Sequence, residues 1–351
     1  MPLQVDIEKT LGDFHLKVAF RAETGVLALL GASGCGKSMT LKCIAGVEKP
    51  DRGRIVLDDR VLFDSDRGIC LPPQKRQIGF LFQQYALFPN MSVRQNIICG
   101  VRERKGKREA ADAMIQRMHL EGLEDKKPGQ LSGGQQQRTA LARILVSQPG
   151  ALLLDEPFSA MDSHLRFQLE REVRHTIRLF QKPVILVSHS RDEVYRLANV
   201  IAVMGSGCIE TIGGKHEVFA DPATRTGAVL TGCKNVSPVR RTGGQTFMAA
   251  DWGIPLTLPG APPDTAYVGI RMHDIRPARE GETLNVFRCR VEEEIENPFS
   301  FTVMLRPENT AAPLPLGWEM EKPAWERLRA EWVTVCLPQE GLLKLKGEST
   351  C

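Results

Sequence analysis

Gly31-Ala32-Ser33-Gly34-Cys35-Gly36-Lys37-Ser38 fits the pattern G-x-x-x-x-G-K-[ST], with an apolar run at 26–30 before it and a helix-like run at 38–45 after it. This context is typical of a triphosphate-binding loop, because glycines let successive backbone N–H groups and the helix N-terminus face a phosphate. Lys37 is expected to reach the β- and γ-phosphates. The Ser38 hydroxyl is expected to bind Mg²⁺, a small hard ion that takes few protein oxygens. A simple glycine-rich turn is the weaker alternative, because the flanking runs agree with the pattern.

Apolar strands and amphipathic helices alternate up to about residue 205 of the 351 residues. Strands separated by helices predict an α/β core with a largely parallel sheet. Between about 84 and 148 helical patterns replace the strands, which predicts a helical subdomain inserted in this core. The predicted buried strands lie at 26–30, 78–82, 151–154, 184–187 and 200–204.

The C-terminal third has a different pattern. Turn-forming Gly and Pro residues accumulate from Gly205 onward, and the apolar stretches that follow are short and interrupted. Such stretches predict a small β-barrel or sandwich. We place the boundary near residue 230, which gives two domains at 1–230 and 231–351 and agrees with the length of the chain.

Composition excludes some partners and leaves others open. Lys and Arg number 46 against 42 for Asp and Glu, and this net charge of +4 gives no reason to expect nucleic acid. The basic run at 102–108 has no interleaved aromatic residues for base stacking, so we expect a solvated loop or helix start. The nine cysteines lack C-x-x-C pairs and metal-ligand spacing, which predicts reduced thiols in a cytosolic protein. We find no signal-peptide pattern and no apolar run of about 20 residues, so we expect other chains to make any membrane crossing.

An acidic pair follows the apolar run at 151–154, in the order Asp155-Glu156-Pro157. The carboxyl ends of parallel strands are where α/β folds hold their ligands. Asp155 is expected to hold the Mg²⁺ hydration shell, and Glu156 to accept a proton from water that attacks the γ-phosphate. A strand end capped by an ordinary turn is the alternative for such a run taken alone.

Six sequence elements follow one another along the chain: the phosphate loop, Gln83 after 78–82, Leu131-Ser132-Gly133-Gly134-Gln135, Leu152 to Pro157, Ser159-Ala160-Met161-Asp162 and Val187-Ser188-His189. In this order they resemble the ATP-binding subunits of ABC transporters. The resemblance is strong over about the first 230 residues, and its most specific element is the signature L-S-G-G-Q-Q-Q-R. It implies a P-loop ABC-type nucleotide-binding domain with a helical subdomain, followed by a small β-barrel-like domain of OB or TOBE type.

The resemblance also implies roles for single residues in binding ATP and Mg²⁺. Gln83 would contact Mg²⁺ or the attacking water and link the nucleotide site to the helical subdomain. His189 would contact the γ-phosphate and help to position Glu156. Met39 stands where the family usually has a second hydroxyl residue, which leaves its backbone N–H as the phosphate contact. Phe14 is the nearest candidate for stacking on adenine, with a packed core aromatic as the alternative.

The signature implies that the nucleotide site is shared between two chains. In this family Ser132, Gly133, Gly134 and Gln135 face the ATP bound by the opposite subunit, from a helix start that can address a γ-phosphate. A head-to-tail homodimer would hold two ATP molecules and separate after hydrolysis. Asp162 would lie at that interface.

The resemblance extends to a class of cargo. The runs at 53–57, 60–63 and 68–76 are similar to molybdate-import ATPases, and sulfate and other oxyanion importers are near relatives. Val268-Gly269-Ile270-Arg271 is similar to the G-I-R-P-E stretch of the β domain in such ATPases, whereas Met272-His273 departs from it. His273-Asp274 lacks further metal ligands at suitable spacing, so we expect a turn there.

We therefore expect the ATP-hydrolysing subunit of a molybdate importer, peripheral on the cytoplasmic face of the membrane. The implied partners are a second copy, transmembrane permease subunits and, indirectly, an extracytoplasmic solute-binding protein. A short permease helix would dock near Gln83, Tyr85 and Phe88.

Several alternatives stay open. The importer could carry sulfate or another solute. A DNA-repair or chromosome-organising ATPase would separate the loop from the signature by a long coiled coil, but Leu131 lies only 94 positions after Lys37, without sustained heptads between them. A nucleotide-gated regulator would bind ATP and hydrolyse little, against which Glu156 and His189 argue.

Overall fold

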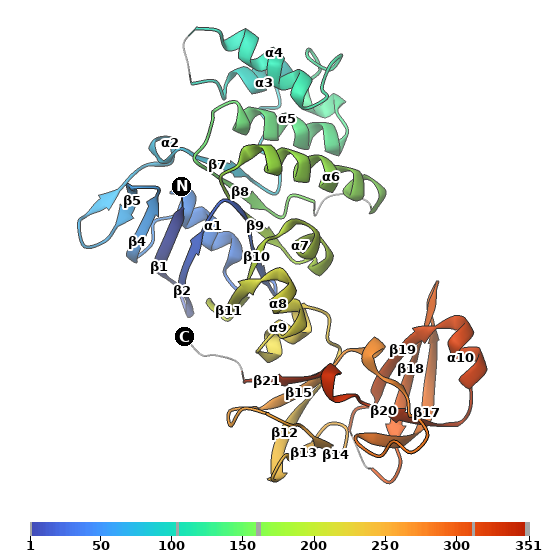
Figure 1. Ribbon diagram of the computed structural model, residues 1–351. Helices are drawn as coiled ribbons and strands as arrows, with labels where there is room; N and C mark the ends of the chain where they lie inside the picture. The colour runs from blue at the N-terminus through green and yellow to red at the C-terminus, as the bar shows by residue number, and fades with distance from the viewer. Residues whose placement is uncertain (1, 103–104, 159–162, 311–312, 348–351) are drawn as a thin grey trace. The chain divides into compact units, whose positions relative to one another are not determined.

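The computed structural model describes residues 2–102, 105–158, 163–310 and 313–347 (Figure 1). They form two compact units that divide between Lys215 and His216. Each unit has its own core and is described by itself.

The N-terminal unit is built on one 11-stranded sheet in the order β6-β5-β4-β1-β2-β11-β10-β3-β9-β8-β7. The five strands from β10 to β7 pair in parallel, and β1, β2, β4 and β5 pair antiparallel. The strands are β1 Leu3–Leu11, β2 Phe14–Ala22, β3 Gly25–Gly31, β4 Arg52–Leu57, β5 Arg60–Asp64, β6 Ile69–Cys70, β7 Ile78–Leu81, β8 Ala151–Asp155, β9 Pro183–Ser188, β10 Val200–Gly205 and β11 Cys208–Gly214.

Burial patterns explain the two parts of this sheet. Every residue of β8 and β9 is buried, as expected for parallel strands covered on both faces. In β1 and β2 buried and exposed residues alternate instead, which is the pattern of strands with one solvated face. The parallel α/β core predicted from the sequence is confirmed, and an antiparallel sheet portion that the sequence analysis did not anticipate extends it.

Helices α3 to α6 gather beside the β7–β8 edge of the sheet (Figure 1). Between residues 84 and 148, the described part of the chain consists of helices and turns. The helices of this unit are α1 Lys37–Ala45, α2 Pro73–Arg76, α3 Val93–Ile98, α4 Lys107–Arg117, α5 Gly133–Leu145, α6 Ser163–Phe180 and α7 Arg191–Leu197, with a 3₁₀ turn at Pro128–Gln130; α8 Lys215–Ala220 follows at the division of the units.

A buried arginine fixes the end of α1, the helix that follows the phosphate loop. Arg76 is fully buried and donates hydrogen bonds to the carbonyl oxygens of Cys43 at 2.8 Å, Ile44 at 2.9 Å and Leu71 at 2.7 Å. Two of these carbonyls belong to the last turn of α1, where a cation is favoured by the helix dipole. Burial lowers the pKa of Arg76. The contact ties α1 to the segment before β7.

The C-terminal unit is β-rich, which confirms the predicted fold class. It contains two five-stranded sheets in the orders β14-β13-β12-β15-β21 and β16-β20-β17-β18-β19. Trp252, Trp318 and Trp325 are buried in its core, and the Trp318 indole donates to the carbonyl oxygen of Ile275 at 2.7 Å. The elements are α9 Arg225–Leu230, β12 Asn235–Gly243, β13 Thr246–Ala249, β14 Ile254–Thr257, β15 Tyr267–Ile270, β16 Arg276–Pro277, β17 Val286–Glu296, β18 Ser300–Pro307, β19 Leu316–Glu321, α10 Lys322–Leu328, β20 Trp332–Cys336 and β21 Leu342–Leu345, with 3₁₀ turns at Met272–Asp274 and Gln339–Gly341.

Two further features bear on the sequence predictions. Among the described residues seven cysteines are free thiols, whereas Cys208 is disulfide-bonded, which corrects the prediction of reduced thiols at that position. The free thiols are Cys35, Cys43, Cys70, Cys99, Cys233, Cys289 and Cys336. Over the described ranges, no helix has both the length and the apolar character that a membrane span requires.

Candidate functional site

The phosphate loop joins the end of β3 at Gly31 to the start of α1 at Lys37. Gly34 and Gly36 have φ of +82° and +103°, in the left-handed region that favours glycine. A Cβ on Gly36 would lie 2.6 Å from Leu16 Cδ1 and 3.1 Å from the Phe14 ring. Residues 32–34 are exposed, whereas Cys35 is buried as a small filler. The loop therefore needs glycine for its path and offers its outer backbone to solvent.

Lys37 is held inside this loop. Its ammonium donates to the carbonyl oxygens of Gly31 at 2.8 Å and Ala32 at 2.7 Å, and its side chain is 6% exposed. The first turn of α1 contains no acidic residue, so the positive end of the helix dipole is not compensated there. Ammonium, helix N-terminus and glycine N–H groups together give the loop the character of an anion site.

Ser38 and Asp155 meet although 117 residues separate them. The Ser38 hydroxyl, at the start of α1, donates to Asp155 Oδ1 at the end of β8 over 2.8 Å. Burial raises the pKa of Asp155, and the hydrogen bond from Ser38 partly opposes this shift. A hydroxyl and a carboxylate side by side form a hard oxygen donor set that fits Mg²⁺, which needs only one or two carboxylates besides phosphate oxygens and waters.

Glu156 and His189 lie at the carboxyl ends of the neighbouring strands β8 and β9. His189 Nδ1 is 3.4 Å from Glu156 Oε2. Glu156 has a φ of +45°, and its backbone N–H still donates to the Val187 carbonyl oxygen at 3.0 Å. A left-handed φ is uncommon for a residue other than glycine, and it occurs in turns and at functional sites. The turn after β8 thus brings the Glu156 carboxylate close to the His189 imidazole.

A buried glutamate that the sequence analysis missed supports this histidine. Glu193, in α7, accepts a hydrogen bond from the Ser188 hydroxyl at 2.6 Å, and the Ser190 N–H donates to the same hydroxyl at 2.9 Å. Glu193 is 4% exposed, and burial raises its pKa. Because Ser188 and Ser190 flank His189, the glutamate fixes the backbone that carries the imidazole. The spacing Ser190-x-x-Glu193, a capping pattern at the start of α7, was the available signal.

The other residues predicted to bind nucleotide, Mg²⁺ or a permease helix differ in their exposure. Gln83 is exposed just after β7. Met39 and Phe14 are partly buried and pack against the core of the unit, and the Phe14 ring also lies beside Gly36 of the phosphate loop. Of the residues predicted to receive a permease helix, Tyr85 is buried and its carbonyl accepts from Arg143 at 3.2 Å, whereas Phe88 is 46% exposed.

The signature segment opens helix α5. Ser132 is its N-cap, with reciprocal bonds in which the Gln135 N–H donates to Ser132 Oγ and the Ser132 N–H donates to Gln135 Oε1. Ser132 and Gly133 are exposed, while Gly134 is buried. No hydrogen bond or ion pair connects these residues to the phosphate loop of the same chain where both are described. Ser159, Ala160, Met161 and Asp162 lie outside the described residues.

Comparison with known proteins identifies the family of the chain. A family model described as ABC transporter matches residues 16–159. A molybdenum import ATP-binding protein of Rhodospirillum rubrum is 39% identical over 222 residues, which cover 63% of this chain and 60% of that protein, so the match spans under two thirds of that relative. A sulfate/thiosulfate import ATP-binding protein of Chromobacterium violaceum is 37% identical over 335 residues, which cover 93% of this chain and 89% of that protein.

A solved structure described as the dimeric post-hydrolysis state of an ATP-binding cassette, bound to ADP and Pi, matches with a TM-score of 0.51. It is 27% identical in sequence, and the match covers 61% of this chain and 99% of that one. The sulfate/thiosulfate import protein aligns over nearly the whole length of both proteins, and the fold agrees with this match. The chain belongs to the family of ABC transporter ATP-binding subunits.

Proposed function

We propose that this chain hydrolyses ATP to ADP and phosphate as the motor subunit of an ABC importer. The observation that carries the proposal is the convergence of Lys37, Ser38, Asp155, Glu156 and His189 at the carboxyl edge of the parallel sheet. Two contacts join residues that are distant in the sequence, Ser38 with Asp155 at 2.8 Å and Glu156 with His189 at 3.4 Å. This set combines an anion loop, hard oxygen donors and a carboxylate base, which are the parts that phosphoryl transfer to water requires.

The loop residues bind the nucleotide in this proposal. The backbone of residues 31–39 and the Lys37 ammonium hold the β- and γ-phosphates, with Lys37 exchanging its carbonyl acceptors for phosphate oxygens. Ser38, Asp155 and Gln83 would hold Mg²⁺, which neutralises developing charge on the phosphates when bound.

Glu156 acts as the general base. It accepts a proton from the water whose oxygen attacks the γ-phosphorus, while the bond to the bridging oxygen breaks and ADP leaves. His189, fixed by Ser188 and Glu193, orients the Glu156 carboxylate through Nδ1 and keeps Nε2 for the γ-phosphate. The strained φ of Glu156 stores part of this preorganisation in the turn.

We place the signature of a second copy over each nucleotide. Ser132 and Gly133 are exposed at the N-terminus of a 13-residue helix and make only local contacts among the described residues, so they are free to meet a phosphate presented by another chain. Dimeric association of a related cassette supports this arrangement. A homodimer with two shared ATP sites follows, with residues 1–230 as the ATP-binding domain and 231–351 as an accessory domain.

For cargo we propose an oxyanion, with molybdate first and sulfate second. The support is the likeness to a molybdenum import protein and, over most of the chain, to a sulfate/thiosulfate import protein. Transmembrane permease subunits and an extracytoplasmic binding protein would complete the importer, with this chain peripheral on the cytoplasmic face. The exposed Phe88 is the docking contact we retain for a permease helix.

Two measurements test the proposal. ATP hydrolysis by the purified chain should be lost in Lys37→Ala and kept in Lys49→Ala, an exposed lysine outside the site. Uptake of labelled molybdate and of labelled sulfate should then be compared in a strain lacking this chain, with and without the wild-type gene. Activity that survives Lys37→Ala would refute the ATPase assignment, and restored uptake of neither anion would refute the cargo assignment.

A further inference from the structure

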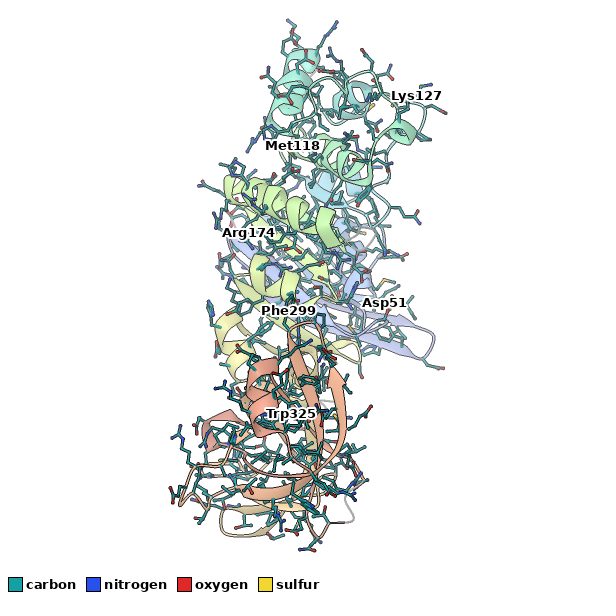
Figure 2. All side chains as sticks on the ribbon, turned by 90° about the vertical axis from the view of Figure 1, so that its right-hand side faces the viewer. Asp51, Met118, Lys127, Arg174, Phe299 and Trp325 are labelled. Carbon is teal, nitrogen blue, oxygen red and sulfur yellow. The ribbon has the colours of Figure 1, made fainter. Side chains whose placement is uncertain are left out.

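A cavity of about 690 Å³ opens in the helical part of the N-terminal unit, between the end of α4, helix α5 and helix α6. Figure 2 labels one residue from each side of it, Met118 after α4 and Arg174 on α6. Its described lining shares no residue with the nucleotide site. The volume falls within the range of about 300 to 1,000 Å³ that is usual for small-molecule sites.

A buried polar side chain lies in this cavity without a partner. Gln137, in α5, is 0% exposed, and both its amide nitrogen and its amide oxygen lack a hydrogen bond within the described ranges. Leaving a buried carboxamide unpaired is costly, so such groups normally bind protein, water or ligand. Gln137 belongs to the lining of the cavity, so this unpaired carboxamide lies in the cavity wall.

The other polar groups in the lining are mostly cationic. Among the described lining residues Glu172 is the one carboxylate, and its Oε2 is 3.6 Å from Arg138 Nε, which is longer than a hydrogen bond. The Nε atoms of Arg138 and Arg174 are buried and have no hydrogen-bond partner in the described structure. The basic residues that line the cavity are Arg117, His119, Arg138, Arg171, Arg174, His175 and Arg178.

We propose that this cavity binds a small phosphate-bearing anion at a site separate from the nucleotide site. Arginine forks match phosphate oxygens bidentately, and the local surplus of positive charge is not balanced by Glu172 alone. The Gln137 carboxamide adds a neutral, unpaired hydrogen-bonding group to the wall of this cationic cavity. The cavity exceeds what one inorganic phosphate fills, so the preferred ligand carries more than one phosphate group or an organic portion.

Inorganic pyrophosphate is the probe, and isothermal titration calorimetry is the measurement. The full-length chain is first saturated with ADP, so that the phosphate loop is occupied and heat reports a second site. Wild type should bind pyrophosphate, and Arg174→Ala and Gln137→Glu should weaken the affinity about tenfold or more, the loss expected for one charge-assisted contact. Arg108→Ala, an exposed arginine of α4 outside the cavity lining, should bind like wild type.

Two results would overturn the proposal: no pyrophosphate binding to the ADP-loaded wild type, or equal affinity in all three variants. Circular dichroism checks that each variant is folded. Should Gln137→Glu fail to fold, Arg174→Ala decides the question alone, because its partly exposed side chain can be shortened without opening the core. A pyrophosphate-dependent rise in Tm, present in wild type and Arg108→Ala and absent in Arg174→Ala, gives the same answer by a second route.

Discussion

Replacing Arg76 by Met tests whether the phosphate-loop helix depends on a buried cation at its C-terminal end. Methionine keeps an unbranched side chain of similar length and removes every donor. The Leu71 and Ile44 carbonyls then lose the hydrogen bond that Arg76 gives each of them, whereas the Cys43 carbonyl keeps the N–H of Gly46 at 3.2 Å. One buried acceptor, the Ile44 carbonyl, and one part-buried acceptor, the Leu71 carbonyl, are therefore left unpaired.

We expect this change to lower the free energy of unfolding of the N-terminal unit by about 2 to 3 kcal/mol, because each unpaired buried carbonyl costs roughly 1 to 3 kcal/mol. Burial of the charged guanidinium is itself unfavourable and lowers the pKa of Arg76. Its removal in Arg76→Met therefore offsets part of the lost unfolding free energy. For a domain of this size the change corresponds to a Tm lower by about 5 to 10 °C.

The assay is urea unfolding followed by two probes. All four tryptophans, Trp252, Trp318, Trp325 and Trp332, lie in the C-terminal unit, so their fluorescence reports that unit, while far-UV circular dichroism also follows the helices of the N-terminal unit. Lys75→Met is the matched control, since Lys75 is the exposed neighbour on the same short helix. A loss below about 0.5 kcal/mol for Arg76→Met, or an equal loss for Lys75→Met, would refute the reasoning.

Three further changes probe the site itself. Gly36→Ala should lower the free energy of unfolding by about 2 kcal/mol or more and abolish nucleotide binding, because φ is +103° and the new Cβ meets Leu16. Gly68→Ala is the control: φ is +66° there, the space around the new Cβ is open, and nucleotide binding should stay intact. Equal nucleotide affinity in the two variants would contradict this prediction. Asp155→Asn should abolish hydrolysis yet raise the free energy of unfolding at pH 7. Burial raises the pKa of Asp155, so ionisation of this carboxyl destabilises the folded wild type as the pH rises above about 4. The difference in unfolding free energy between variant and wild type, measured by urea titration, should therefore shrink toward pH 4. Glu193→Ala should lower kcat for ATP with little change in KM, and Glu193→Gln should recover much of the activity by accepting the Ser188 bond; a pure KM effect would argue against a positioning role.

Much of the fold was predictable because it rests on local patterns. Fully apolar runs such as 151–154 and 184–187 predict buried parallel strands, and both lie in such strands. The antiparallel strands β1 and β2 were missed because their half-exposed alternation is a weaker signal, and their pairing with β4 depends on contacts distant in sequence.

The candidate site was predictable where a motif carries the chemistry, as for Lys37 and Glu156. What the sequence could not show was how single residues are supported. Nothing in the local sequence of Arg76 indicates that it donates hydrogen bonds to the last turn of α1. Glu193 was visible only as a helix-capping residue, although it holds the segment around His189 through Ser188. The unpaired carboxamide of Gln137 arises from three helices packing around it, a tertiary fact that no spacing encodes.

In the proposed mechanism two copies share two ATP sites, and Glu156 is the base. Glu156→Gln examines both points at once, by sedimentation of the purified chain with ATP and with ADP and by a measurement of ATP turnover. We expect loss of turnover and a stable dimer with ATP that is absent with ADP, because ATP then binds between two chains and is not consumed. A variant that stays monomeric with bound ATP, or that hydrolyses ATP at the wild-type rate, would show that this mechanism is wrong.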